Sequence, residues 1–198
     1  KLMVGKVSGT KFGMGISGAK NSLIDELVNE ELDGCIEVDD YESEDMAFGT
    51  ENEPIAIDEY TKMCGIEFER GGVILSDFSP IHMSSPDAVN VGRGIVVEVK
   101  CTMHGKTQIS RFRFGIDSKY KPQVLNYFAC SDDVKEVHWI SYCPFRPERP
   151  LVIIIVTLDT VFDKGKTVRQ IITDGRLLLK KVEQDVKELK DNFTTINF

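Results

Sequence analysis

The chain has 198 residues, and 32 acidic residues against 24 basic residues give it a formal net charge of −8. With 41% hydrophobic and 28% charged residues, its composition is that of a folded globular protein and excludes a disordered or fibrous chain. The longest apolar run, residues 151–156, is far shorter than the roughly 18 residues of a membrane-spanning helix, so no membrane partner is expected.

Hydrophobic periodicity predicts helices and strands in a mixed order along the chain. A segment rich in Gly, Ser and Thr, residues 5–18, comes first. The predicted helices cover residues 19–32, 46–64, 120–130 and 173–192. The predicted strands cover residues 72–75, 95–101, 108–114, 136–143 and 151–158. This order predicts a single α/β domain over residues 1–198, with a mixed central β-sheet flanked by helices.

Charge is unevenly distributed along the sequence. Residues 25–69 contain 17 acidic residues and one basic residue, Lys62. Residues 100–121 contain six basic residues and one acidic residue, Asp117. Because two solvent-exposed faces of opposite charge explain this contrast as well as a binding surface does, the charge pattern alone assigns no function.

The strongest chemical pattern joins Ser85-Pro86-Asp87 to Glu98-Val99-Lys100. Because side chains alternate along a strand, Glu98 and Lys100 share one face. Asp87 and Glu98 could then converge on a hard cation such as Mg²⁺ or Mn²⁺, with Lys100 alongside. Such a centre hydrolyses phosphodiester bonds, because the metal activates a bound water and offsets charge on phosphorus. By pattern alone, an ion pair on a strand beside an ordinary turn remains the alternative.

Four motifs in order give the chain a resemblance to a known family. They are Gly49-Thr-Glu-Asn-Glu53 on a predicted helix, Ser85-Pro86-Asp87, Glu98-Val99-Lys100 and Gln123-Val-Leu-Asn-Tyr127, which fits a QxxxY pattern. The chain resembles the PD-(D/E)xK nucleases, and within them the lambda exonuclease and YqaJ-type viral recombinases. Residues 5–10 resemble the loop before the first helix of that family. The resemblance implies a restriction-endonuclease-like core and a Mg²⁺-dependent 5′-to-3′ exonuclease acting on double-stranded DNA in viral homologous recombination.

The resemblance also implies roles for individual residues. The implied metal ligands are Asp87, Glu98 and the carbonyl of Val99. The implied catalytic residues are Lys100, which would activate water, Glu53 and Gln123. The implied DNA contacts are Ser8 and Thr10 at a 5′-phosphate, and Tyr127, Lys106, Arg111 and Arg113 near the strand.

Partners and location follow from the same resemblance. It implies a homotrimeric ring, double-stranded DNA ends as substrate, a single-strand-annealing protein as partner, and the cytoplasm of an infected bacterium. Five cysteines without a CxxC pair fit a reducing compartment. A structure- or sequence-specific endonuclease of the same fold and a non-catalytic DNA-binding or assembly module remain alternatives. Residues 13–18 match GxGxxG, but without continuing βαβ units a flexible loop or the start of a helix is the preferred interpretation.

Overall fold

The computed structural model describes residues 3–36 and 43–195. Its centre is a five-stranded sheet in the order β1-β4-β5-β6-β7. The strands are β1 (Glu69–Arg70), β4 (Ala88–Asn90), β5 (Ile95–Cys101), β6 (Glu136–Tyr142) and β7 (Leu151–Thr157). Only the β5–β6 pair is parallel among these neighbours, so the sheet is mixed. Two small hairpins flank it, β2 (Ile74–Leu75) with β3 (Met83–Ser84) and β8 (Val161–Asp163) with β9 (Lys166–Thr167).

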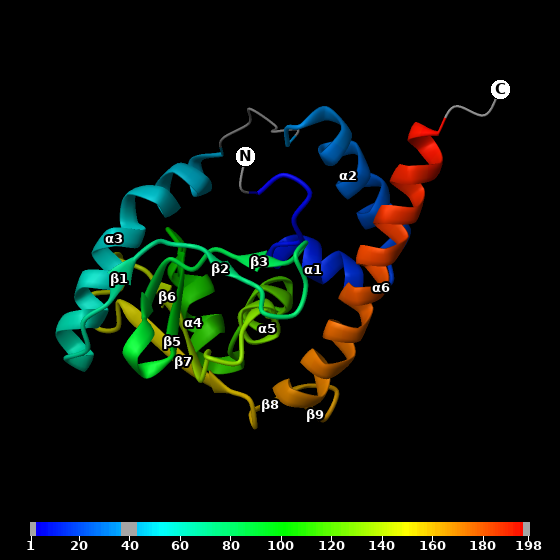
Figure 1. Ribbon diagram of the computed structural model, residues 1–198. Coiled ribbons are helices and arrows are strands. Elements are labelled where there is room, and N and C mark those ends of the chain that lie inside the picture. The colour runs from blue at the N-terminus through cyan, green and yellow to red at the C-terminus, as the bar shows by residue number, and fades with distance from the viewer. Residues whose placement is uncertain (1–2, 37–42, 196–198) are drawn as a thin grey trace.

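Helices cover both faces of this sheet (Figure 1). On one face lies α3 (Glu44–Cys64), which packs against β5. On the other lie α1 (Gly9–Ile16) and α5 (Lys121–Cys130), backed by the paired helices α2 (Lys20–Asp33) and α6 (Val168–Thr194). Helix α4 (Gly105–Phe114) packs against β6 and β7, and the short 3₁₀ turns η1 (Val91–Arg93) and η2 (Ser118–Tyr120) precede β5 and α5. The predicted α/β class with a mixed sheet between helices is confirmed.

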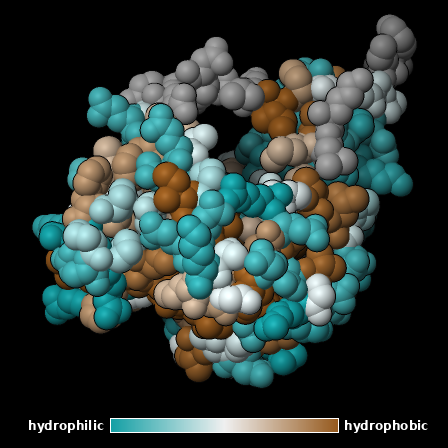
Figure 2. All heavy atoms as spheres, turned by 90° about the vertical axis from the view of Figure 1, so that its left-hand side faces the viewer, coloured by the Kyte–Doolittle hydropathy of each residue, from teal (hydrophilic) through white to brown (hydrophobic). Residues whose placement is uncertain are grey.

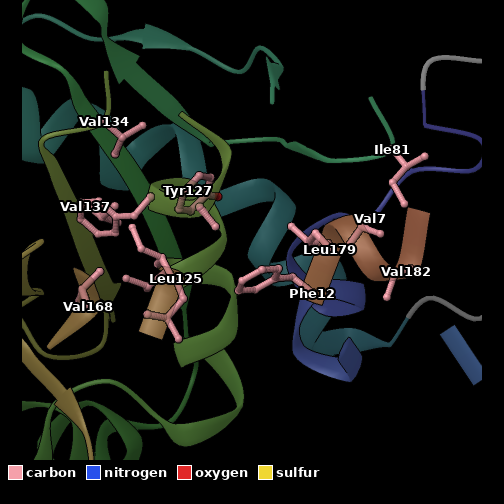
Figure 3. Close-up of a cluster of buried hydrophobic side chains, with 14 of the residues drawn as sticks. Val7, Phe12, Ile81, Leu125, Tyr127, Val134, Val137, Val168, Leu179 and Val182 are labelled. Carbon is pink, nitrogen blue, oxygen red and sulfur yellow. The ribbon is translucent and has the colours of Figure 1, made fainter. Parts of the chain in front are cut away.

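Alternation along the strands separates two hydrophobic clusters. Val97 and Val99 face α3, where they pack with Ala56, Ile57 and Tyr60. On the opposite side Trp139 is completely buried, in the larger cluster that joins the sheet to α1, α2, α5 and α6; Figure 3 shows part of this cluster. Glu98, between Val97 and Val99, therefore faces the α5 side.

Three sequence predictions about the elements need correction. Residues 108–114 form a helix rather than a strand, because the alternating apolar side chains that suggested a strand, such as Phe112 and Phe114, are exposed while Gln108 and Arg111 point inward. Residues 9–16 form helix α1, so residues 13–18 are its end and the turn after it, not a flexible loop or a helix start. Helix α6 begins at Val168, where Thr167 and Gln170 form a capping box, rather than at residue 173.

None of the helices within residues 3–36 and 43–195 is both long and apolar enough to span a bilayer. The α3 side of the molecule mixes hydrophilic and hydrophobic side chains (Figure 2). Met46, Ile55 and Met63 are among the exposed apolar residues of α3.

Candidate active site

Strand pairing brings Asp87 and Glu98 together. In the antiparallel β4–β5 register Ala88 lies opposite Val97, so Asp87, the residue before β4, lies beside this part of β5. The backbone N–H of Asp87 donates to the Val97 carbonyl at 3.2 Å, which holds this residue against β5. The Asp87 carboxylate lies close enough to Glu98 for its charge to act on it. Asp87 Oδ2 also accepts the Val99 N–H at 2.6 Å, which fixes the orientation of its carboxylate.

Glu98 is a fully buried carboxylate with a donor on each oxygen. The Lys100 ammonium donates to Oε1, and the Tyr127 hydroxyl donates to Oε2. The same hydroxyl lies 3.2 Å from the Ser85 carbonyl, which ties α5 to the segment before Asp87. Burial, with the added repulsion of Asp87, raises the pKa of Glu98 to about 7 despite the opposing effect of Lys100. Ionising Glu98 in the folded protein therefore costs free energy that its hydrogen bonds to Lys100 and Tyr127 do not fully offset.

The neighbouring ionisable groups, Asp87, Glu53 and Lys100, also have raised pKa values. Burial raises the pKa of Asp87, and burial together with the charge of Asp87 raises the pKa of Glu53, which reaches the site from α3. Burial by itself lowers the pKa of Lys100, but the Glu98 carboxylate outweighs that effect and raises the pKa above its ordinary value. Lys100 is thus held as an ammonium ion among three carboxyl groups.

The donor set fits a hard divalent cation that keeps some of its own water. Across the described residues, no three His, Cys, Asp or Glu side chains converge to hold a metal ion by themselves. The available oxygens are those of the Asp87 and Glu98 carboxylates and of the Val99 backbone carbonyl. The N–H and C=O of one strand residue point toward the same neighbouring strand, so the Val99 carbonyl faces Asp87, as the Val99 N–H does. Mg²⁺ is commonly bound through one or two carboxylates, with waters and phosphate oxygens completing its shell.

A cleft of about 580 Å³ opens at the carboxyl end of β5. Val99, Lys100 and Cys101 form its floor, and Glu53 borders it from α3. Polar side chains make up much of its lining, among them Thr107 and Arg111 from α4. The size and the charged floor suit an extended polar substrate better than a small apolar one.

Gln123 and Tyr127 of α5 connect this centre to the amino-terminal segment. A side chain on Gly9 would come within 2.9 Å of Gln123 Cγ, so α1 can approach α5 this closely only with glycine there. Ser8 precedes α1 as its N-cap without a side-chain capping bond, and Thr10 is exposed in the first turn. Neither Ser8 nor Thr10 is among the residues that line the cleft.

The basic residues expected near DNA fall into two groups. Lys106 and Arg113 are exposed on α4. Arg111 differs from the expected surface position, since only 4% of it is exposed and its guanidinium donates to Asp117, to the Lys100 carbonyl and to Ser141. Arg111 is buried because residues 105–114 form a helix, and the helical period, rather than the alternation of a strand, decides which of their side chains face inward.

The sequence patterns missed Thr107 and Tyr120, which border the cleft. Their spacing matches no motif, and only their nearness in sequence to Lys100 and Gln123 could have pointed to them. His82, which sequence reasoning left out of the site, is buried at 1% exposure in the hydrophobic interior.

Comparisons with known proteins agree with the fold. The alkaline exonuclease LHK-Exo from Laribacter hongkongensis superposes with a TM-score of 0.75 at 22% identity, over 96% of this chain and 94% of that one. Its complex with dAMP gives 0.74 at 21% identity over the same shares. A phage-related exonuclease from Haemophilus somnus 129PT gives 0.60 at 12% identity, over 96% of each chain. These likenesses concern the fold.

No curated protein matches the chain by sequence. The model of the YqaJ-like viral recombinase domain, in contrast, matches residues 3–133, a stretch that contains Glu53, Asp87, Glu98, Lys100 and the QxxxY pattern. Since that match spans well over half of the sequence, the chain belongs to the YqaJ-like viral recombinase domain family.

Proposed function

We propose that the protein is a Mg²⁺-dependent deoxyribonuclease that digests double-stranded DNA from a 5′ end during viral recombination. One observation carries the proposal: Asp87, which accepts a hydrogen bond from the Val99 N–H, lies beside the fully buried Glu98, and the Glu98 carboxylate accepts from the Lys100 ammonium. Family membership supports it, and so do the structural neighbours, which are described as exonucleases, one of them in complex with dAMP.

The residues divide the work of phosphodiester hydrolysis between them. Asp87, Glu98 and the Val99 carbonyl would hold Mg²⁺. When bound, the metal would lower the pKa of a coordinated water and offset charge on the phosphate. Lys100, on the floor of the cleft, would orient the attacking water and stabilise its negative charge as the proton leaves. Glu53 would act on the same water from the α3 side.

Other residues would support this centre or hold the DNA. Tyr127 would keep Glu98 in place through its hydrogen bond, and Gln123 would support Tyr127 from the preceding turn of α5. Lys106 and Arg113 would contact the phosphate backbone, since both are exposed and basic. Ser8 and Thr10 would bind the 5′-terminal phosphate at the start of α1.

The assembly and location expected from the family are part of the same proposal. A homotrimeric ring would surround the duplex and keep the overall acidic surface on its outside, which removes the conflict between a net charge of −8 and a polyanionic substrate. A single-strand-annealing protein would take up the remaining strand, in the cytoplasm of an infected bacterium.

The test is digestion of linear duplex DNA by the purified protein. With Mg²⁺ or Mn²⁺, a duplex carrying a 5′-phosphate should lose mononucleotides from that end, and a chelator should stop the reaction. Asp87→Asn should lose metal affinity and cleavage together, because one of two carboxylate ligands becomes neutral. Nicking of closed circular DNA would instead identify an endonuclease. Unchanged DNA after long incubation with Mn²⁺ would leave a non-catalytic module and reject the proposal.

A further inference from the structure

Lys100 needs a support other than Glu98. A lysine side chain is a flexible stem of four carbons, and an ammonium held only by Glu98 is free to move whenever that carboxylate turns to another partner. About a fifth of the Lys100 side chain is exposed, on the side that faces the cleft. A second contact that does not involve a carboxylate would keep the ammonium at one place.

Tyr120 provides such a contact. The Lys100 Nζ lies 5.3 Å from the centroid of the Tyr120 ring, within the range of a cation–π interaction. Tyr120 ends η2 and borders the cleft directly beside Lys100. Because the attraction comes from the face of the ring, it persists whichever partner Glu98 takes.

The Tyr120 ring has two further neighbours, Arg111 and Trp139. The Arg111 guanidinium lies 5.7 Å from the Tyr120 centroid, and the buried Trp139 ring lies 6.2 Å away. Arg111 Nε donates to Asp117 Oδ2 at 3.1 Å, and the Asp117 carbonyl accepts the Tyr120 N–H at 2.9 Å. The turn that carries Tyr120 is therefore anchored to α4 through Arg111.

Arg111 anchors the backbone of Lys100 as well. Its Nη1 donates to the Lys100 carbonyl at 3.1 Å and to Ser141 Oγ at 2.9 Å. Ser141 in turn donates to Gln108 Oε1 at 2.6 Å, so the guanidinium is locked into a buried network between α4 and β6. One buried arginine thus fixes both the strand that bears the lysine and the turn that bears the ring.

We propose that Tyr120 is a positioning residue, which together with Arg111 holds the Lys100 ammonium at the floor of the cleft. This inference rests on the proposed nuclease function for its kinetic consequence, but the geometry it describes can be measured without catalysis. It also gives Arg111 a task different from the DNA contact that its charge suggests.

The kinetic test compares two replacements of one residue. Tyr120→Phe keeps the ring face and should retain near-normal kcat, whereas Tyr120→Leu should lower kcat about 10-fold with little change in KM. In a Lys100→Ala background, Tyr120→Leu should cause no further loss, because the group that it positions is gone. An equal loss in both backgrounds, or a loss confined to KM, would mean that Tyr120 acts on the DNA instead and would overturn the inference. So would a Tyr120→Phe variant as slow as Tyr120→Leu.

A second measurement does not depend on activity. In protein labelled with ¹³C-lysine, the Cε methylene signal of Lys100, assigned by its loss in Lys100→Ala, should be displaced upfield by the ring current of Tyr120. Tyr120→Leu should remove the displacement and Tyr120→Phe should keep it. Lys119, whose Nζ lies 4.8 Å from the same ring, is the internal control and should respond in parallel. An undisplaced Lys100 signal overturns the inference even in an active enzyme, whereas a displaced signal in an inactive protein supports it and rejects only the nuclease proposal.

Discussion

Acid should destabilise the protein through one buried histidine. His82 is 1% exposed, and its Nε2 lies 2.7 Å from Asn126 Oδ1 while its Nδ1 lies 3.2 Å from Ser76 Oγ. The Asn126 amide donates to the Met83 carbonyl, so its oxygen is left to accept. Nε2 must then carry the proton and Nδ1 must accept from Ser76, which satisfies a neutral imidazole and leaves no acceptor for a second proton.

The size of the effect follows from the shift in pKa. Burial, with a smaller contribution from the nearby Arg176 charge, lowers the pKa of His82 from 6.5 to about 4. A histidine with a lowered folded-state pKa contributes stability that is present above its unfolded pKa and is lost as the pH falls toward the folded value. Between about pH 8 and about pH 5 this linkage removes about 2 kcal/mol from the free energy of unfolding.

Urea unfolding, followed by the fluorescence of the single Trp139, measures the loss. Glu98 titrates in the opposite sense, because its raised pKa makes the folded state more stable as the pH falls from about 7. The informative quantity is therefore the difference in pH dependence between the wild type and His82→Gln, from which Glu98 cancels. The exposed histidine variant His104→Gln is the control and should track the wild type. Parallel curves for the wild type and His82→Gln, or an NMR titration of His82 near pH 6.5, would refute the reasoning.

Three further predictions concern catalysis and packing. Lys100→Ala should slow cleavage at least about 100-fold while DNA and Mn²⁺ binding persist; a near-normal kcat would remove its role toward water. Phe12→Ala should lower the free energy of unfolding by about 3–5 kcal/mol in urea titrations, because Phe12 is 1% exposed in the main cluster; a cost below about 1 kcal/mol would contradict the packing. Gly94→Ala should cost about 2 kcal/mol or more, since Gly94 has a φ of +67° and a Cβ there would lie 2.4 Å from the Asp133 carbonyl oxygen. Gly92→Ala is its control and should change the melting temperature far less, since a Cβ there would make only an ordinary contact, 3.7 Å from Asn90 Oδ1.

The sequence by itself determined the elements whose pattern agrees with their burial. The strand over residues 95–101 was predicted with its observed limits, and α2, α3, α5, β6 and β7 were predicted within two residues at each end. In each of these segments apolar residues recur at the period of the element and face a hydrophobic cluster. The shared face of Glu98 and Lys100 followed from the same alternation, because a strand allows no other arrangement.

Tertiary structure decided the rest, where local pattern and burial disagree. Residues 105–114 fold as a helix with Gln108 and Arg111 inside, because a hydrogen-bond network with Ser141 and the Lys100 carbonyl replaces the apolar contacts that a pattern can detect. The approach of Asp87 to Glu98 depends on the register between two strands. The positions of Tyr120 and Tyr127 depend on how α5 and the turn before it pack onto the sheet. Such contacts join residues far apart in sequence, and no local periodicity records them.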